Sequence, residues 1–136
     1  MYDRIIVAVA LAEGAQDAAL LEQAGRLVQP AGRIHLIHVL EEVPSYIVAA
    51  LPPEALQARR AEAMVELRDM ATATGVDCLP EVRQGAPAPA ILEAAAAHGA
   101  DLIMIASHRP DLRDYFIGST AARVVRHAKC SVLVCR

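Results

Sequence analysis

The residues best suited to chemistry lie between a short aliphatic run and a helical pattern in the last third of the chain. They are polar or small, and they are Ser107, His108 and Arg109, followed by Gly118, Ser119 and Thr120. Free amide N–H groups and the positive dipole end at the start of a helix attract anions. A glycine there lets a phosphate approach the backbone. The stretch predicts a phosphate site, with ordinary helix capping by the two hydroxyls as the competing interpretation.

The histidines do not form a metal-binding pattern. His35 and His38 are three residues apart on a predicted strand, so their side chains point to opposite faces and cannot share one metal ion. His98 and His127 fall in the last turns of predicted helices, where an imidazole interacts favourably with the negative dipole end, and we expect capping roles. His108 has no nucleophile that the sequence can pair with it. We expect it to contact a ligand or to be structural rather than catalytic.

Motifs for efficient phosphoryl transfer are missing from the sequence. There is no GxxxxGK[ST], no GxGxxG after the first apolar run and no carboxylate cluster suited to Mg²⁺. The three cysteines, Cys78, Cys130 and Cys135, show no CxxC spacing, which indicates reduced thiols rather than a disulfide framework or a zinc site. We therefore expect a binding protein rather than an enzyme, with slow ATP hydrolysis as an open alternative.

Composition narrows the class further. The chain has 136 residues, 55% hydrophobic and 21% charged, with a net charge of −3, no Trp, one Phe and three Tyr. These values fit one compact domain over residues 1–136 and give no basic surface or stacking platform for nucleic acid. The apolar run from Ile5 to Ala12 is too short for a signal peptide or membrane span. We expect no membrane insertion and a cytoplasmic location.

Apolar runs and helical patterns alternate along the chain. The runs are short and nearly continuous, as in strands buried on both faces, and they are Ile5–Val9, Ile34–Leu40, Val76–Val82, Leu102–Ala106 and Ser131–Cys135. Helical stripes lie between them, the first including Val28 and the last Ile117, Ala121, Val124 with Val125, and Ala128. Gly32, Gly75 and Gly99 are expected to end helices, and Pro87 to begin one. This alternation predicts an α/β fold with a five-stranded parallel sheet and helices on both faces.

For strand order 3-2-1-4-5, a ligand is expected beyond the carboxyl ends of the strands, between the first and fourth strands. The segments that meet there are Ala8 to Glu13, Val39 to Glu42 and Ala106 to Thr120. The long connection EEVPSYIVAALPPEALQ, residues 41–57, is expected to be a lid or a subunit contact. The residues alone leave both interpretations open.

The chain resembles the universal stress protein family over nearly all of its length. The likeness lies in RIIVAV at the start, IHLIHVLEE, ILEAAAAHGADLIMIASH and, most specifically, GSTAARVVRHAKCSVLVCR at the end. The resemblance implies a flavodoxin-like, Rossmann-like three-layer sandwich. It also implies a homodimer in which the C-terminal strand, residues 131–136, runs antiparallel to its copy, and binding of ATP, AMP or ADP, with or without Mg²⁺. The nucleotide state would regulate contact with a protein partner that the sequence does not identify.

This resemblance assigns a set of nucleotide-contacting candidates, which are Ala8, Ala10, Val39, Ile105, Ser107, His108, Arg109, Gly118, Ser119 and Thr120. The family motif G-x2-G-x9-G-[ST] is met only in part. Ala106 and Arg109 replace its first two glycines, and eight residues separate Arg109 from Gly118. Pro110 disfavours a glycine-like backbone at Arg109, whose guanidinium could instead contact phosphate, fill the space or face solvent.

Ala10 stands where the family usually has an aspartate at the end of the first strand. Losing that acceptor costs roughly 1.5 to 3 kcal/mol, or one to two decades of affinity. We expect weak nucleotide binding, and a ligand-free interaction module on the same fold is the alternative. A phosphoacceptor receiver is excluded, because the first and third apolar runs end without the acidic residues it needs. Flavin binding has little support without aromatic residues to stack the ring.

Overall fold

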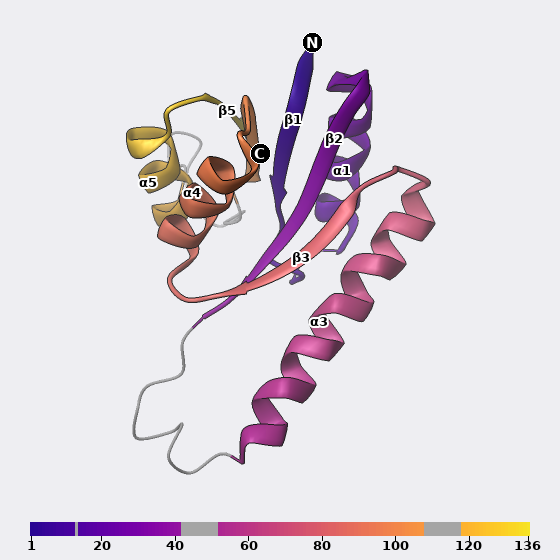
Figure 1. Ribbon diagram of the computed structural model, residues 1–136, viewed down its shortest axis with the longest axis vertical. Coiled ribbons are helices and arrows are strands. Elements are labelled where there is room, and N and C mark those ends of the chain that lie inside the picture. The colour runs from indigo at the N-terminus through magenta and orange to yellow at the C-terminus, as the bar shows by residue number, and fades with distance from the viewer. Residues whose placement is uncertain (13, 42–51, 108–117) are drawn as a thin grey trace.

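The computed structural model describes residues 1–12, 14–41, 52–107 and 118–136. It contains one parallel sheet with strand order β3-β2-β1-β4-β5 and helices on both faces, as the sequence predicts (Figure 1). The strands are β1 (Tyr2–Ala8), β2 (Val28–Leu40), β3 (Leu79–Gln84), β4 (Leu102–Ala106) and β5 (Ser131–Cys135). The helices are α1 (Gly14–Leu27), α3 (Pro53–Thr74), α4 (Pro87–His98) and α5 (Ser119–His127).

Each face of the sheet has its own hydrophobic core. One core joins the α1 and α3 side chains to one face, with Ile5, Leu21 and Leu67 fully enclosed. The other joins α4 and α5 to the opposite face, with Ile6, Ile103 and Val124 fully enclosed. Consecutive residues of β1 therefore belong to different cores, which is why its sequence is continuously apolar.

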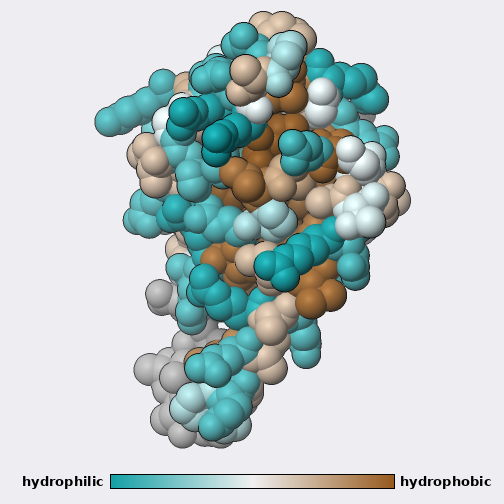
Figure 2. Space-filling model, turned by 45° about the vertical axis from the view of Figure 1, so that its right-hand side comes forward, coloured by the Kyte–Doolittle hydropathy of each residue, from teal (hydrophilic) through white to brown (hydrophobic). Residues whose placement is uncertain are grey.

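Helix α3 is much longer than the face it covers. Only Ala63 and Leu67 of its 22 residues are buried, and its N-terminal half extends beyond the carboxyl edge of the sheet (Figure 1). Figure 2 shows mainly hydrophilic side chains along this extended end. The helix begins at Pro53, so the long connection after β2 ends at Pro52 rather than at Gln57. The lid or subunit contact expected for it falls largely on residues 42–51, outside the described residues.

The predicted strand boundaries agree with the structure in the C-terminal half of the chain and differ from it in the N-terminal half. The ranges predicted for β4 and β5 are correct, whereas β1 begins at Tyr2, β2 at Val28 and β3 at Leu79. Gly75 and Gly99 end α3 and α4 with left-handed φ angles of 70° and 65°, and Pro87 begins α4, as expected.

The prediction for Gly32 was wrong, because this residue lies inside β2 rather than at a helix end. A Cβ atom at Gly32 would lie 2.6 Å from the Asp3 carbonyl oxygen, so close strand approach requires glycine. The β1–β2 register shifts between Tyr2 and Arg4 at the same place. Val28, expected in the first helical stripe, accordingly belongs to the strand.

The stripe predicted for α5 is only partly correct. Ala121 and Val124 are buried against the sheet, but Val125 is 48% exposed. Ile117 lies outside the described residues. A nine-residue helix presents about two and a half turns, too few to bury a wide stripe.

Candidate functional site: a cleft at the carboxyl edge of the sheet

A cleft of about 440 Å³ opens where the carboxyl ends of β2, β1 and β4 meet. This is the point at which the strand order reverses, as expected for ligand sites of such sheets. The walls come from three strand ends and three helices. The lining residues are Ala8, Val9, Ala10, Ile37, His38, Val39, Leu40, Glu41, Arg59, Pro87, Ile91, Ile105, Ala106 and Thr120.

The turn after β1 forms one rim of the cleft. Ala10 is exposed there, and Leu11 adopts a left-handed backbone with φ 64°. The Leu11 amide donates a 3.1 Å hydrogen bond to Oδ2 of Asp17, a fully buried residue of α1. Left-handed backbone is strained for a leucine, so the buried carboxylate helps to hold this turn in place.

The carboxyl end of β2 is tied to β1 beneath the cleft. The Val9 amide donates to the Ile37 carbonyl at 2.9 Å, and Nδ1 of His38 lies 2.8 Å from the Val9 carbonyl oxygen, to which it donates as the protonated ring nitrogen. Beyond them lie two charged residues of the lining, Glu41 and Arg59. This side of the cleft therefore has a fixed backbone floor and charges at its rim.

The start of α5 forms the opposite side. Gly118 is the N-cap, with φ 77° and ψ 155°, and no side chain caps the helix. The competing interpretation, in which Ser119 or Thr120 caps this helix, is therefore wrong: both are within its first turn, and Gly118 precedes them. A Cβ at Gly118 would contact Oγ of Ser107 at 4.0 Å, so β4 and α5 come together here. First-turn amides without a side-chain cap are suited to an anion.

The candidate residues divide into three groups. Ala8, Ala10, Val39, Ile105 and Thr120 line the cleft. Ser107, Gly118 and Ser119 are not part of its lining, although the first two adjoin its β4 and α5 side. His108 and Arg109 lie outside the described residues.

Several lining residues were not anticipated. Pro87 and Ile91 come from the start of α4, and Arg59 comes from α3. A strand-end rule identifies the ends of strands but not which helical residues overhang them. His38, expected to be a packed or edge residue, is half-buried and also contacts the Val9 carbonyl at the cleft floor.

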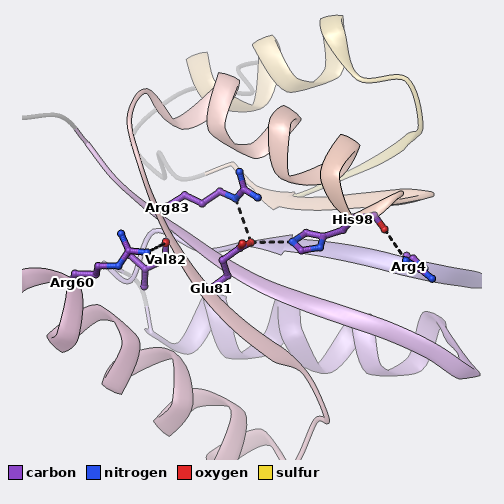
Figure 3. Close-up of polar contacts among 6 residues, drawn as sticks. All are labelled: Arg4, Arg60, Glu81, Val82, Arg83 and His98. Atoms are coloured by element: carbon purple, nitrogen blue, oxygen red, sulfur yellow. Dashed lines mark hydrogen bonds and ion pairs between the residues drawn. The ribbon is translucent and has the colours of Figure 1, made fainter.

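A second polar cluster lies away from the cleft, between β3 and α4 (Figure 3). Glu81 lies between an imidazole and a guanidinium: its Oε2 is 3.2 Å from Nε2 of His98 and 3.3 Å from Nε of Arg83. The His98 ring stacks on that of His35, with centroids 3.8 Å apart. His98 thus contacts a neighbouring strand rather than capping its own helix, which Gly99 ends.

Electrostatics in this cluster favour a neutral His35 and an ionised Glu81. Burial lowers the pKa of His35 below its ordinary 6.5, and the adjacent His98 lowers it further. Burial raises the pKa of Glu81, but contacts with His98 and Arg83 outweigh it, so the net pKa lies below 4.5.

Metal and membrane sites find no support within the described ranges. No group of three or more His, Cys, Asp or Glu residues is arranged to hold a metal ion among residues 1–12, 14–41, 52–107 and 118–136. Across the same ranges, no helix has the length and apolar character needed to span a membrane. The three cysteines are free and half-buried, and burial raises the pKa of each thiol.

Comparison with known proteins gives consistent matches over the full length. The family model "Universal stress protein family" matches residues 1–136. The universal stress protein in the QAH/OAS sulfhydrylase 3'region of Thermus aquaticus is 36% identical over 141 residues, covering 100% of both chains. Universal stress protein G of Shigella flexneri is 32% identical over 145 residues, again covering 100% of both.

Solved structures share the fold. Hypothetical protein MJ0577 superposes with a TM-score of 0.81 at 23% identity, covering 99% of this chain and 96% of the other. A universal stress protein in complex with cAMP gives 0.67 at 21% identity, covering 99% and 97%. The universal stress protein from Archaeoglobus fulgidus in complex with dAMP gives 0.63 at 20% identity, covering 99% and 98%. With a family match over its whole length and relatives above 30% identity, the chain belongs to the universal stress protein family.

Proposed function

We propose that this protein binds an adenine nucleotide in the cleft at the carboxyl edge of its sheet and acts as a regulatory protein. The observation that carries the proposal is the cleft itself. It combines a mostly apolar floor, first-turn amides of α5 without a side-chain cap and a volume of about 440 Å³. Clefts of roughly 300 to 1,000 Å³ with few polar groups are typical of small-molecule sites.

Structural neighbours support the choice of ligand. Two universal stress proteins of the same fold were solved with cAMP and with dAMP, both adenine nucleotides. In this chain the phosphate would lie at the start of α5, near Gly118 and Thr120, and Gly118 would leave room for it. AMP, ADP and ATP all fit this chemistry. With no acidic residue at Ala10, a Mg²⁺ ion would bind mainly through the phosphates rather than through the protein.

A ligand-free interaction module is the second candidate, and Ala10 is the observation that favours it. The family resemblance would place an aspartate at the end of β1, where its carboxylate could accept a hydrogen bond from a ribose hydroxyl. Ala10 has no such group. Among the described residues that line the cleft, the one carboxylate is that of Glu41, on the β2 side. The two candidates differ in whether the cleft binds nucleotide in solution.

Restoring the missing acceptor tests the proposal directly. Ala10→Asp is expected to strengthen AMP and ATP binding by about ten- to a hundredfold, because one charged hydrogen-bond acceptor contributes roughly 1.5 to 3 kcal/mol. Isothermal titration calorimetry at nucleotide concentrations up to the millimolar range, with and without Mg²⁺, measures the change. Ala97→Asp, on an exposed residue at the far end of α4, is the matched control and should leave affinity unchanged.

Absence of heat and of a thermal shift in both the wild type and Ala10→Asp would overturn nucleotide binding and leave the interaction module. A gain in Ala10→Asp with weak wild-type binding would support both the site and the role of the missing aspartate. Acid precipitation gives a second measurement, because released adenine absorbs strongly while the chain has no Trp and only three Tyr.

We also propose that the protein is a homodimer through its C-terminal strand. β5 is at the edge of the sheet, and its sequence SVLVC has three central aliphatic residues and no charge. An exposed edge of this kind is usually covered, and two antiparallel copies related by a two-fold axis would cover each other. Nucleotide binding next to β4 would then be one strand away from the dimer contact.

A further inference from the structure

We propose that Arg59 stacks its guanidinium on the base of the bound nucleotide and so contributes to recognition of a purine. This inference rests on the proposed function, since it assigns one end of the same cleft. Arg59 belongs to α3, which was not among the segments expected to form the cleft.

Arg59 differs from the other lining residues in its charge, and its guanidinium has no hydrogen-bond partner among the described residues. It is the one cation among the described residues that line the cleft, and it is exposed. It makes no hydrogen bond or ion pair with any residue in the described ranges. Its guanidinium is therefore not engaged by a described protein group that a ligand would have to displace.

The neighbouring arginine faces the sheet edge beside the cleft. Nη2 of Arg60 donates a 3.0 Å hydrogen bond to the Val82 carbonyl on β3, drawn in Figure 3. Consecutive helical residues point about 100° apart, because a turn contains 3.6 residues. Arg60 therefore faces the β3 edge, and Arg59, one residue earlier on the helix, lines the adjacent cleft.

The two ends of the cleft are suited to different parts of a nucleotide. Thr120 and the start of α5 lie on the β4 side, whereas Arg59 and Glu41 lie beyond β2. Strands β2 and β4 flank β1 and are about 10 Å apart, at roughly 4.8 Å per neighbouring strand. A phosphate at the α5 end would direct the base toward the β2 end, next to Arg59.

The described lining contains no Phe, Tyr or Trp on which a base could stack. A guanidinium is planar, weakly hydrated and stacks on π-systems, so arginine can take over this role. Lysine lacks the plane and would not replace it. Arg59 could alternatively bind the phosphates. If Arg59 stacks on the base, removing it should weaken every ligand that has the base; if it binds phosphate, the loss of affinity should grow with the number of phosphates.

Calorimetry with adenosine, AMP and ATP separates these arrangements in the wild type, Arg59→Ala, Arg59→Lys and the control Arg68→Ala, which alters an exposed arginine of α3 outside the lining. Stacking predicts a similar loss of about tenfold for all three ligands in Arg59→Ala, little rescue by Arg59→Lys and no change in Arg68→Ala. Unchanged affinities in Arg59→Ala would overturn the assignment. A loss that grows from adenosine to ATP and is rescued by lysine would overturn stacking in favour of a phosphate clamp. A wild type that binds none of the ligands would overturn the proposed function itself.

Discussion

Strands β3 and β5 each have one neighbour in the sheet, yet their free edges differ in chemistry. β3 reads LPEVRQ and carries a proline and two charged residues, whereas β5 reads SVLVC and carries neither. The Gly85 amide donates to the Leu40 carbonyl at 2.9 Å, so the backbone groups of Gly85 and of alternate residues before it bond to β2. The backbone amide and carbonyl groups of Pro80, Val82 and Gln84 therefore point away from the sheet. Of these, Pro80 has no amide hydrogen, and the Val82 carbonyl is taken by Arg60.

The same geometry applied to β5 leaves its edge open. The Ser107 amide donates to the Cys135 carbonyl at 2.7 Å, so Cys135 and alternate residues before it bond toward β4. Val132 and Val134 therefore present their amide and carbonyl groups outward. Proline, charge and covering side chains are the usual protections of an edge strand, and β3 has all three. Of the two edges, β5 is therefore the one that the proposed homodimer would pair through.

The largest expected effect comes from giving β5 the protection that β3 already has. Val134→Pro removes an outward amide from each protomer while leaving the bonds to β4, and the lost pairing and ring clash should cost about 3 kcal/mol, about a hundredfold in dimer affinity. Sedimentation at micromolar concentration should show a shift from dimer toward the 14.5 kDa monomer.

Val134→Thr is the matched control, because it keeps the amide and the β-branched shape. A wild type that sediments only as a monomer would refute the dimer. A folded Val134→Pro variant that remains fully dimeric would place the contact elsewhere.

A smaller effect is expected from removing the protection of β3. Pro80→Val combined with Arg60→Ala restores an outward amide and frees the Val82 carbonyl, so assemblies larger than the wild-type species should appear, with self-association strengthened about tenfold by one or two added hydrogen bonds. Light scattering during gel filtration measures the mass distribution. Arg68→Ala, which removes another arginine of α3, should leave it unchanged; an unchanged distribution in the double variant would show that the β3 edge is protected by something else.

The smallest expected effect is a pH response confined to the β3 side. The lowered pKa of His35 means that its stabilising contribution is complete above pH 6.5 and declines as the pH falls toward the folded-state pKa. The lowered pKa of Glu81 adds a second loss as the pH falls below 4.5. When the pH is lowered from 7.5 to 5.5, backbone amide hydrogen exchange, corrected for its intrinsic pH dependence, should therefore become faster in β3 and α4. The change in β5 should be much smaller.

His35→Phe removes the first titration and retains a ring that can stack on His98, so it should flatten the response between pH 7.5 and pH 5.5. Equal acceleration in β3 and β5 would contradict a local origin.

Much of the fold could be predicted from pattern, and the misses have local causes. The apolar runs of β4 and β5 gave their boundaries, because Asp101 and Ser107 flank β4 and Arg136 follows β5. The early start of β2 escaped prediction because Gly32 resembles a helix end, and only the 2.6 Å approach of the Asp3 carbonyl explains its presence in a strand.

The cleft could be located from strand order, but its helical wall could not. Ala8, Ala10, Val39 and Ile105 lie at or beside strand ends, and such positions follow from topology. Arg59 belongs to a 22-residue helix that buries only Ala63 and Leu67, both C-terminal to it, so the apolar pattern did not reveal that the exposed N-terminal part overhangs the cleft.

The bond between the Leu11 amide and Asp17 has a mechanical consequence. It joins the lip of the cleft to helix α1 rather than to the strand from which that lip emerges. A small sliding or tilting of α1 would pull Leu11 and the adjacent Ala10 with it, while the floor beneath, bonded between β1 and β2, stays still. The width of the cleft opening therefore depends on the position of helix α1.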